Sequence, residues 1–172
     1  MIETEAKIQV PDLPSLREKI LGLGAHLKKE RFFEENTLFD FASRLLLKNK
    51  QVLRLRKIGK KGFLTFKGVP QKSRTFKVRE EHETEIRDER EMRKILRSLG
   101  LKPAFSYQKH RTVFRRGVLK ICLDELDIGN YLELEGPRHD IIRFAKALGF
   151  SRKELIQQDY VQLIKKKRKT KT

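Results

Sequence analysis

The chain has 172 residues, which suits one compact domain with its own core, and no linker rich in Pro, Gly or Ser divides it. Its formal net charge of +18 favours anionic partners: nucleotides, polyphosphate, nucleic acid or an anionic membrane surface. No apolar run could span a membrane and the N-terminus lacks a signal-peptide pattern, so a soluble, cytoplasmic protein is expected. The single cysteine, Cys122, excludes an internal disulfide or a cysteine-based zinc site, and is expected to be an inert core thiol.

Helical spacing of apolar residues, ended each time by glycine, predicts helices at about 13–24, 88–99 and 138–148. A short last helix is expected from about residue 152 into 160–164. Almost everything between is typical of strands separated by turns, at about 2–10, 27–39, 51–58, 62–68, 73–86, 105–116, 118–125 and 130–136. This order predicts one α+β domain over residues 1–164 with a largely antiparallel sheet.

The last eight residues, 165–172, hold six Lys or Arg side chains and no acid. A solvated, disordered tail is the favoured interpretation, and nucleic-acid contact through it is the lesser alternative.

Charged residues recur at every second position along most of the predicted strands, so they share one face of each strand. The acidic positions are Glu3, Glu5, Glu81, Glu83, Glu85, Asp124, Glu133 and Glu135. The basic positions are Lys7, Arg54, Arg56, Lys67, Lys77, Arg79, Lys109, Arg111 and Lys120. A solvated sheet face would explain any one of these strands. Rows saturated with charge, often of one sign, favour a closed barrel of about eight strands whose lumen has an acidic and a cationic wall.

Such rows have a definite chemistry. Carboxylates that face one another repel unless a cation lies between them, and their hard oxygen atoms suit Mg²⁺ or Mn²⁺. Clustered Arg and Lys bind phosphate oxygens, Arg through two parallel hydrogen bonds. Together they indicate phosphoryl or nucleotidyl transfer on a polyanion larger than a monophosphate.

Several short motifs follow one another in a recognisable order. They are Glu3-Thr4-Glu5-Ala6-Lys7, Phe39-Asp40, Arg54-Leu55-Arg56, Thr65-Phe66-Lys67-Gly68, Arg79-Glu80-Glu81-His82-Glu83, Lys109-His110-Arg111, Leu123-Asp124-Glu125, Leu132-Glu133-Leu134-Glu135 and Asp159-Tyr160. This set resembles the CYTH, or triphosphate tunnel metalloenzyme, superfamily. That superfamily includes class IV adenylyl cyclases, thiamine triphosphatases and inorganic tripolyphosphatases.

The resemblance implies a closed eight-stranded antiparallel β-barrel, a tunnel with helices packed outside, often in a homodimer. It implies a metal ion held by Glu3, Glu5, Glu133 and Glu135 together with Asp124, and a second near Glu81 and Glu83. It implies triphosphate binding by Lys7, Arg54, Arg56, Lys67, Lys109 and Arg111. Arg79 is added to this set, although it could instead pair with neighbouring Glu residues. Glu3, Glu5 and Lys7 are the expected catalytic residues.

Two departures from the family bear on the reaction. Certain hydrolases of the family pair the opening Lys with a Tyr on the second strand, where this chain has Leu38. Some cyclases carry His-Phe upstream of the opening motif, and this chain begins two residues before Glu3. Adenylyl cyclase, which converts ATP to cyclic AMP and pyrophosphate, is the leading expectation, and a thiamine or inorganic triphosphatase is the alternative. A nucleic-acid-binding or polyphosphate-sensing protein without catalysis is a remote third.

Overall fold

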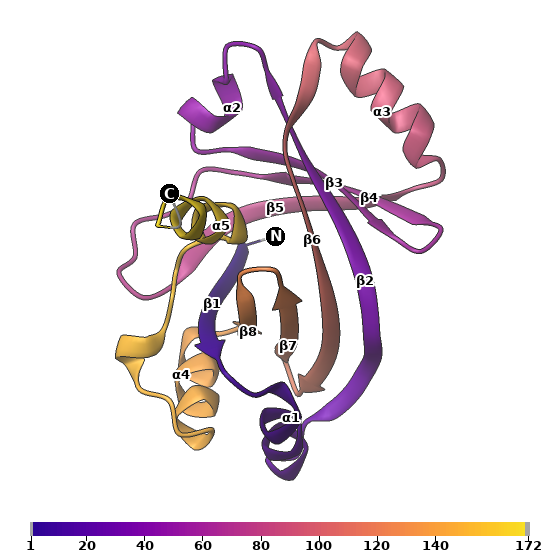
Figure 1. Cartoon of the computed structure of the whole chain (residues 1–172). Helices are drawn as coiled ribbons and strands as arrows, with labels where there is room; N and C mark the ends of the chain where they lie inside the picture. Colours follow the sequence, from indigo (N-terminus) through magenta and orange to yellow (C-terminus); the bar gives the residue numbers. More distant parts are fainter. Residues whose placement is uncertain (1, 171–172) are drawn as a thin grey trace. The chain divides into compact units, whose positions relative to one another are not determined.

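A computed structural model describes residues 2–170 and shows eight strands closed into a barrel in the order β1-β5-β4-β3-β2-β6-β7-β8 (Figure 1). The predicted α+β fold with an eight-stranded antiparallel barrel is thereby confirmed. The strands are β1 (Ile2–Val10), β2 (His26–Phe41), β3 (Val52–Ile58), β4 (Lys61–Lys67), β5 (Lys77–Ile86), β6 (Leu101–Arg116), β7 (Leu119–Leu126) and β8 (Gly129–Glu135). The helices are α1 (Leu13–Gly22), α2 (Leu45–Lys48), α3 (Glu89–Ser98), α4 (Arg138–Ala147) and α5 (Tyr160–Lys169), with a 3₁₀ turn at Arg152–Glu154.

The short helix α2 was not predicted, and a single carboxylate explains it. Asp40 accepts hydrogen bonds from the backbone N–H groups of Phe41, Leu46 and Leu47, at 2.8, 2.9 and 3.0 Å. The bonds from Leu46 and Leu47 satisfy backbone donors at the start of α2, which have no partners within the helix. The Phe39-Asp40 motif therefore has a structural role at the end of β2.

Packing divides the chain into two compact units, each assembled from separate segments. Among the described residues, unit 1 comprises residue 2 with 33–71 and 79–108, and unit 2 comprises 3–32, 72–78 and 109–170. The long strands β2 and β6 each contribute one half to unit 1 and the other half to unit 2.

Unit 2 buries the apolar side chains of alternate strand positions against α1 and α4. Its core includes Ala6, Ile8, Val10, Leu16, Ile20, Ile121, Leu123, Leu132, Leu134, Ile141 and Phe144. Because side chains alternate along a strand, the residues between these apolar positions lie on the opposite face of β1, β7 and β8. That opposite face carries the charged rows predicted from the sequence.

Unit 1 has a smaller core built in the same way. Phe39, Leu55, Ile86, Leu96 and Leu101 pack together, with Met92 and Leu64 at the margin. Leu96 and Met92 come from α3, which presents its apolar side to the strands.

The expected disordered tail is wrong for residues 165–169, because α5 continues through Lys169. Asp159 and Gln162 form a reciprocal capping box at its start, and Lys167 Nζ donates to the carbonyl of Ile128. Basic side chains are favourable at the negative end of a helix dipole, so the lysine-rich sequence suits a last turn. Lys171 and Thr172 lie outside the described residues. No helix within residues 2–170 is long and apolar enough to cross a membrane.

Candidate functional site

The structure divides the predicted site residues between the two units. Unit 2 contains Glu3, Glu5, Lys7, Lys109, Arg111, Asp124, Glu133 and Glu135, and unit 1 contains Arg54, Arg56, Lys67, Arg79, Glu81 and Glu83.

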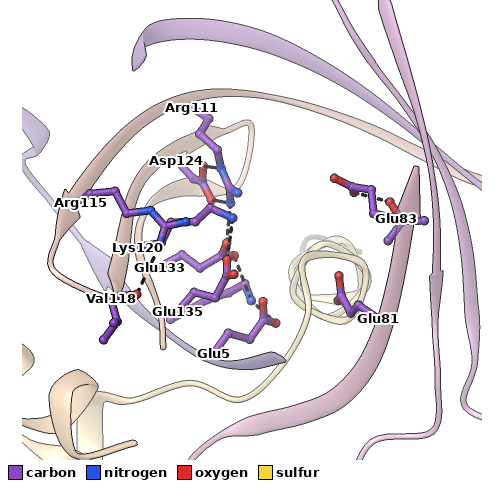
Figure 2. Close-up of polar contacts among 12 residues, drawn as sticks. Glu5, Glu81, Glu83, Arg111, Arg115, Val118, Lys120, Asp124, Glu133 and Glu135 are labelled. Atoms are coloured by element: carbon purple, nitrogen blue, oxygen red, sulfur yellow. Dashed lines mark hydrogen bonds and ion pairs between the residues drawn. The ribbon is translucent and has the colours of Figure 1, made fainter. Parts of the chain in front are cut away.

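The register of the sheet brings the charged residues of unit 2 together. Glu5 on β1 lies opposite Glu135 on β8, and Lys7 lies opposite Glu133. On the other side of β8, Glu135 lies opposite Lys120 of β7. Directly opposed residues of antiparallel strands present their side chains on the same face. The result is a compact patch of alternating acids and bases (Figure 2).

Asp124 of β7 is the centre of this patch and is fully buried. It accepts hydrogen bonds from Arg111 Nε at 2.6 Å and Nη2 at 2.5 Å, and from Lys109 Nζ at 3.1 Å. The hydroxyl of Tyr160, the first residue of α5, donates a further bond of 2.5 Å. A buried carboxylate is tolerated only when it is paired and hydrogen-bonded, and these four bonds meet that requirement.

Two further carboxylates extend the network. Glu133 pairs with Arg111 Nη2 at 2.7 Å and with Lys7 Nζ at 3.2 Å, and Lys7 pairs with Glu5 at 2.8 Å. Burial alone would raise the pKa of Glu133, but Arg111 and Lys7 hold it well below its ordinary value. Burial would likewise lower the pKa of Lys7, yet Glu5 and Glu133 raise it above its ordinary value. Both groups are therefore charged in this state, and Lys7 acts as an internal counterion.

Glu135 is in a different electrostatic position. It accepts a 2.6 Å bond from Lys120, but burial, together with the nearby Glu3, raises its pKa above the ordinary value. Burial is the main cause, because it disfavours the charged form of the carboxyl group, and the negative charge of Glu3 adds to it.

In unit 1, the charged side chains of β3, β4 and β5 also share a face. Arg56 Nη2 lies 2.9 Å from Glu83, and Arg54 Nη2 lies 3.2 Å from the hydroxyl of Thr65. That hydroxyl donates to Glu83 at 2.6 Å, and Lys67 forms an ion pair with Glu81. The predicted rows on these strands are thus cationic on β3 and acidic on β5.

Unit 1 also holds buried polar atoms that lack partners among the described residues. Arg79 is 5% exposed, and its Nε and Nη1 have no hydrogen-bond acceptor within residues 2–170. Asn36, 1% exposed, has neither an acceptor for Nδ2 nor a donor for Oδ1 in the same part of the chain. Buried donors without partners are costly, so such groups indicate a site for a ligand or for water. For Arg79, pairing with neighbouring Glu residues does not account for Nε and Nη1 within residues 2–170.

The sequence analysis did not predict the contacts of two residues, Tyr160 and Glu34. Tyr160 reaches Asp124 from 36 positions along the chain, a distance over which no spacing rule operates. Glu34 is almost fully buried and lies 3.5 Å from Arg56. Because the next residue, Glu35, is also acidic, charge does not alternate there along β2, and no pattern in the sequence marks Glu34.

Cys122 lies between Lys120 and Asp124 on β7, where burial raises the pKa of its thiol to about 12. That pKa agrees with the expected inert thiol.

The carboxylates of unit 2 fit a divalent cation by their chemistry. Glu3, Glu5, Glu133 and Glu135 supply hard oxygen ligands on two adjacent strands, and Glu5 lies directly opposite Glu135. Within residues 2–170, no three His, Cys, Asp or Glu side chains are already grouped as a metal site. Several of these carboxylates are occupied instead by Lys7, Arg111 and Lys120.

Comparison with known proteins identifies the class. The sequence pattern of the CYTH domain family matches residues 1–160, and the chain belongs to that family. A Methanocaldococcus jannaschii protein, provisionally named an adenylate cyclase, is 30% identical in an alignment 174 positions long, which covers 95% of this chain and 98% of that protein.

Solved structures share the fold at lower sequence identity. A Vibrio parahaemolyticus protein, also provisionally named an adenylate cyclase, has a TM-score of 0.85 at 20% identity, covering 96% of this chain and 98% of that one. A Hippeastrum protein, provisionally an adenylyl cyclase and described as having a dominant triphosphatase activity, has a TM-score of 0.62 at 21% identity. The match covers 86% of this chain and 88% of that one.

Proposed function

We propose that this protein is a divalent-metal-dependent enzyme that converts a triphosphate. The observation that carries the proposal is the buried charged face of unit 2, where crowded carboxylates and fixed cations lie side by side. Burying so many charges costs free energy that an apolar face would avoid. A face built in this way is suited to a highly charged ligand and its metal ion.

The chemical roles divide by residue type. Glu3, Glu5, Glu133 and Glu135 would hold Mg²⁺ or Mn²⁺, and Glu81 and Glu83 would serve a second ion. Bound metal neutralises charge that develops on the phosphates during transfer. Triphosphate oxygens would be bound by Lys7, Arg54, Arg56, Lys67, Arg79, Lys109 and Arg111. That both units line one tunnel stays a prediction of the sequence.

Lys7 links the two kinds of binding. Its ammonium group neutralises Glu5 and Glu133, two of the proposed metal ligands. A phosphate oxygen is an equally good partner for this ammonium group. Transfer of Lys7 from carboxylate to phosphate would free Glu5 from this ion pair and leave Glu133 with Arg111 as its partner. Metal and triphosphate should therefore bind with positive coupling, each improving the affinity for the other.

Two reactions fit these roles. In a cyclase, the basic side chains would hold the triphosphate so that the ribose 3′-hydroxyl faces the α-phosphorus, and a metal ion held by the carboxylates would supply further positive charge for the departing pyrophosphate. In a triphosphatase, water attacks the γ-phosphorus. We favour the cyclase because Leu38 stands where certain hydrolases of the family have a Tyr, and because the Methanocaldococcus relative is named as a cyclase. The Hippeastrum protein's described activity makes the triphosphatase the second candidate.

Product analysis tests both. The protein is incubated with ATP, thiamine triphosphate or tripolyphosphate in Mg²⁺, Mn²⁺ or excess chelator, and the products are separated by chromatography. Cyclic AMP and pyrophosphate from ATP would establish the cyclase. Inorganic phosphate with the corresponding diphosphate would establish the triphosphatase. Absence of turnover with all three substrates in both metals contradicts the proposed function.

A further inference from the structure

Helix α5 inserts its first residue into the charged face of unit 2. Tyr160 is 4% exposed, and its hydroxyl donates to Asp124 Oδ2 at 2.5 Å. Its ring lies beneath two ammonium groups, with centroid distances of 5.0 Å to Lys7 Nζ and 4.7 Å to Lys109 Nζ. Cations this close to an aromatic face are attracted by its negative quadrupole. One side chain thus contacts three members of the site.

The end of α5 that carries Tyr160 is held firmly. Asp159, directly before it, accepts 2.9 Å bonds from Lys77 Nζ and from the backbone N–H of Gln162. One turn further on, Ile164 is 1% exposed. A side chain anchored on both sides in this way can fix the groups that it contacts.

Asp124 has little capacity left for a metal ion. Its Oδ1 accepts from Arg111 Nε, and its Oδ2 accepts from Arg111 Nη2, Lys109 and Tyr160. A carboxylate offers about four lone-pair positions, and four donors, three of them on Oδ2, already surround this one. Two of its donor groups are cations, which a metal ion at the same oxygen atoms would repel.

We propose that Tyr160 is a positioning residue that acts through Asp124. The pair fixes Lys109 and Arg111 in the arrangement that receives a triphosphate, and Asp124 serves this purpose instead of holding a metal ion. This inference rests on the proposed function, since it assigns the two cations to a triphosphate. Tyr160 contributes in two ways: its hydroxyl donates a hydrogen bond to Asp124, and its ring makes cation–π contacts with the ammonium groups of Lys7 and Lys109.

The test separates these parts with Tyr160→Phe, which keeps the ring and removes the hydroxyl. Tyr131→Phe is the matched control, because Tyr131 is also buried and its ring meets that of Tyr160 edge to face at 5.6 Å. Tripolyphosphate binding without metal is measured by calorimetry, Mn²⁺ binding without triphosphate by electron paramagnetic resonance, and unfolding by denaturant. A charge-assisted hydrogen bond is the interaction removed, so Tyr160→Phe should weaken tripolyphosphate binding about tenfold. Its Mn²⁺ affinity should stay within about twofold of wild type, and Tyr131→Phe should change neither affinity.

Three results would overturn the inference. Tripolyphosphate binding by Tyr160→Phe within twofold of wild type would show that the hydroxyl positions nothing. An equal loss in Tyr131→Phe would show a general effect of packing. Weaker Mn²⁺ binding in Tyr160→Phe would indicate that Asp124 is a metal ligand. Wild-type protein that binds neither tripolyphosphate nor Mn²⁺ contradicts the proposed function itself, and the inference falls with it.

Discussion

The charged faces of the two units differ in how completely they satisfy their own charges. In unit 2, Asp124, Arg111 and Glu133 are deeply buried and joined by short bonds. In unit 1, Glu83 is about one-third exposed, whereas buried Arg79 has nitrogen atoms without partners among residues 2–170. The charged face of unit 2 is preorganised by its internal ion pairs, whereas that of unit 1 contains buried hydrogen-bond donors without acceptors among residues 2–170. The same residue type should therefore matter for stability in unit 2 and for ligand binding in unit 1.

The largest effect is expected from Arg111→Met, which tests whether the ion pairs of unit 2 stabilise the folded protein. The change leaves Asp124 and Glu133 buried without their main partner. Breaking a buried ion pair from one side costs about 3–5 kcal/mol, so the free energy of unfolding should fall by that amount in denaturant titrations. Arg115→Met on the same strand is the control, since Arg115 is exposed and donates a hydrogen bond to the carbonyl of Val118 (Figure 2). If Arg111→Met lowers the free energy of unfolding no more than the control does, the ion pairs of Arg111 do not stabilise the fold.

Arg79→Met should have the opposite profile. Removing a buried guanidinium with unsatisfied nitrogens should leave the free energy of unfolding unchanged or higher, because no bond to Nε or Nη1 is lost. Tripolyphosphate affinity should fall by about 1.5–3 kcal/mol, the value of a hydrogen bond to a charged group. Calorimetry measures the affinity, with the exposed Arg87→Met of the same unit as the control. Unaltered affinity together with lower stability would assign Arg79 a structural role.

A smaller effect, with a definite dependence on pH, is expected from Glu135→Gln. Because burial and Glu3 raise the pKa of Glu135, its ionised form destabilises the folded state. This cost is absent below the ordinary glutamate pKa of about 4.3 and is complete above the raised value in the folded protein. The variant should therefore equal or exceed wild type in stability at pH 7, by less than about 1 kcal/mol, and lose this advantage in acid. Thermal unfolding across pH measures the difference in stability between the variant and wild type. If this difference favours the variant more in acid than at pH 7, the raised pKa of Glu135 is contradicted.

The sequence predicted one part of this arrangement well because it depends on local periodicity. Alternation along β1, β7 and β8 placed Glu5, Lys7, Asp124 and Glu133 on one face, and the glycine stops located three helices. The pairings could not be predicted, since Lys7 meets Glu133 only through the register of strands more than a hundred residues apart. Tyr160 belongs to the Asp159-Tyr160 motif, yet its hydrogen bond to Asp124 depends on where α5 docks. Composition alone could not predict a helix through 165–169, because a basic run does not reveal the capping box at the start of α5.

The central claim is that the buried acids of unit 2 serve a metal-dependent reaction and do not merely balance its cations. The most direct test is the rate of triphosphate turnover, with saturating Mg²⁺ or Mn²⁺, in wild type, Glu133→Gln and Glu125→Gln. Glu125 belongs to the same unit, but its carboxylate pairs with Arg31 at the surface, so it controls for loss of one negative charge. We expect Glu133→Gln to remain folded and lose at least about a hundredfold in rate, comparable to removing one group that stabilises the transition state. Glu125→Gln should retain the wild-type rate. Equal metal-dependent rates in all three proteins would contradict the account.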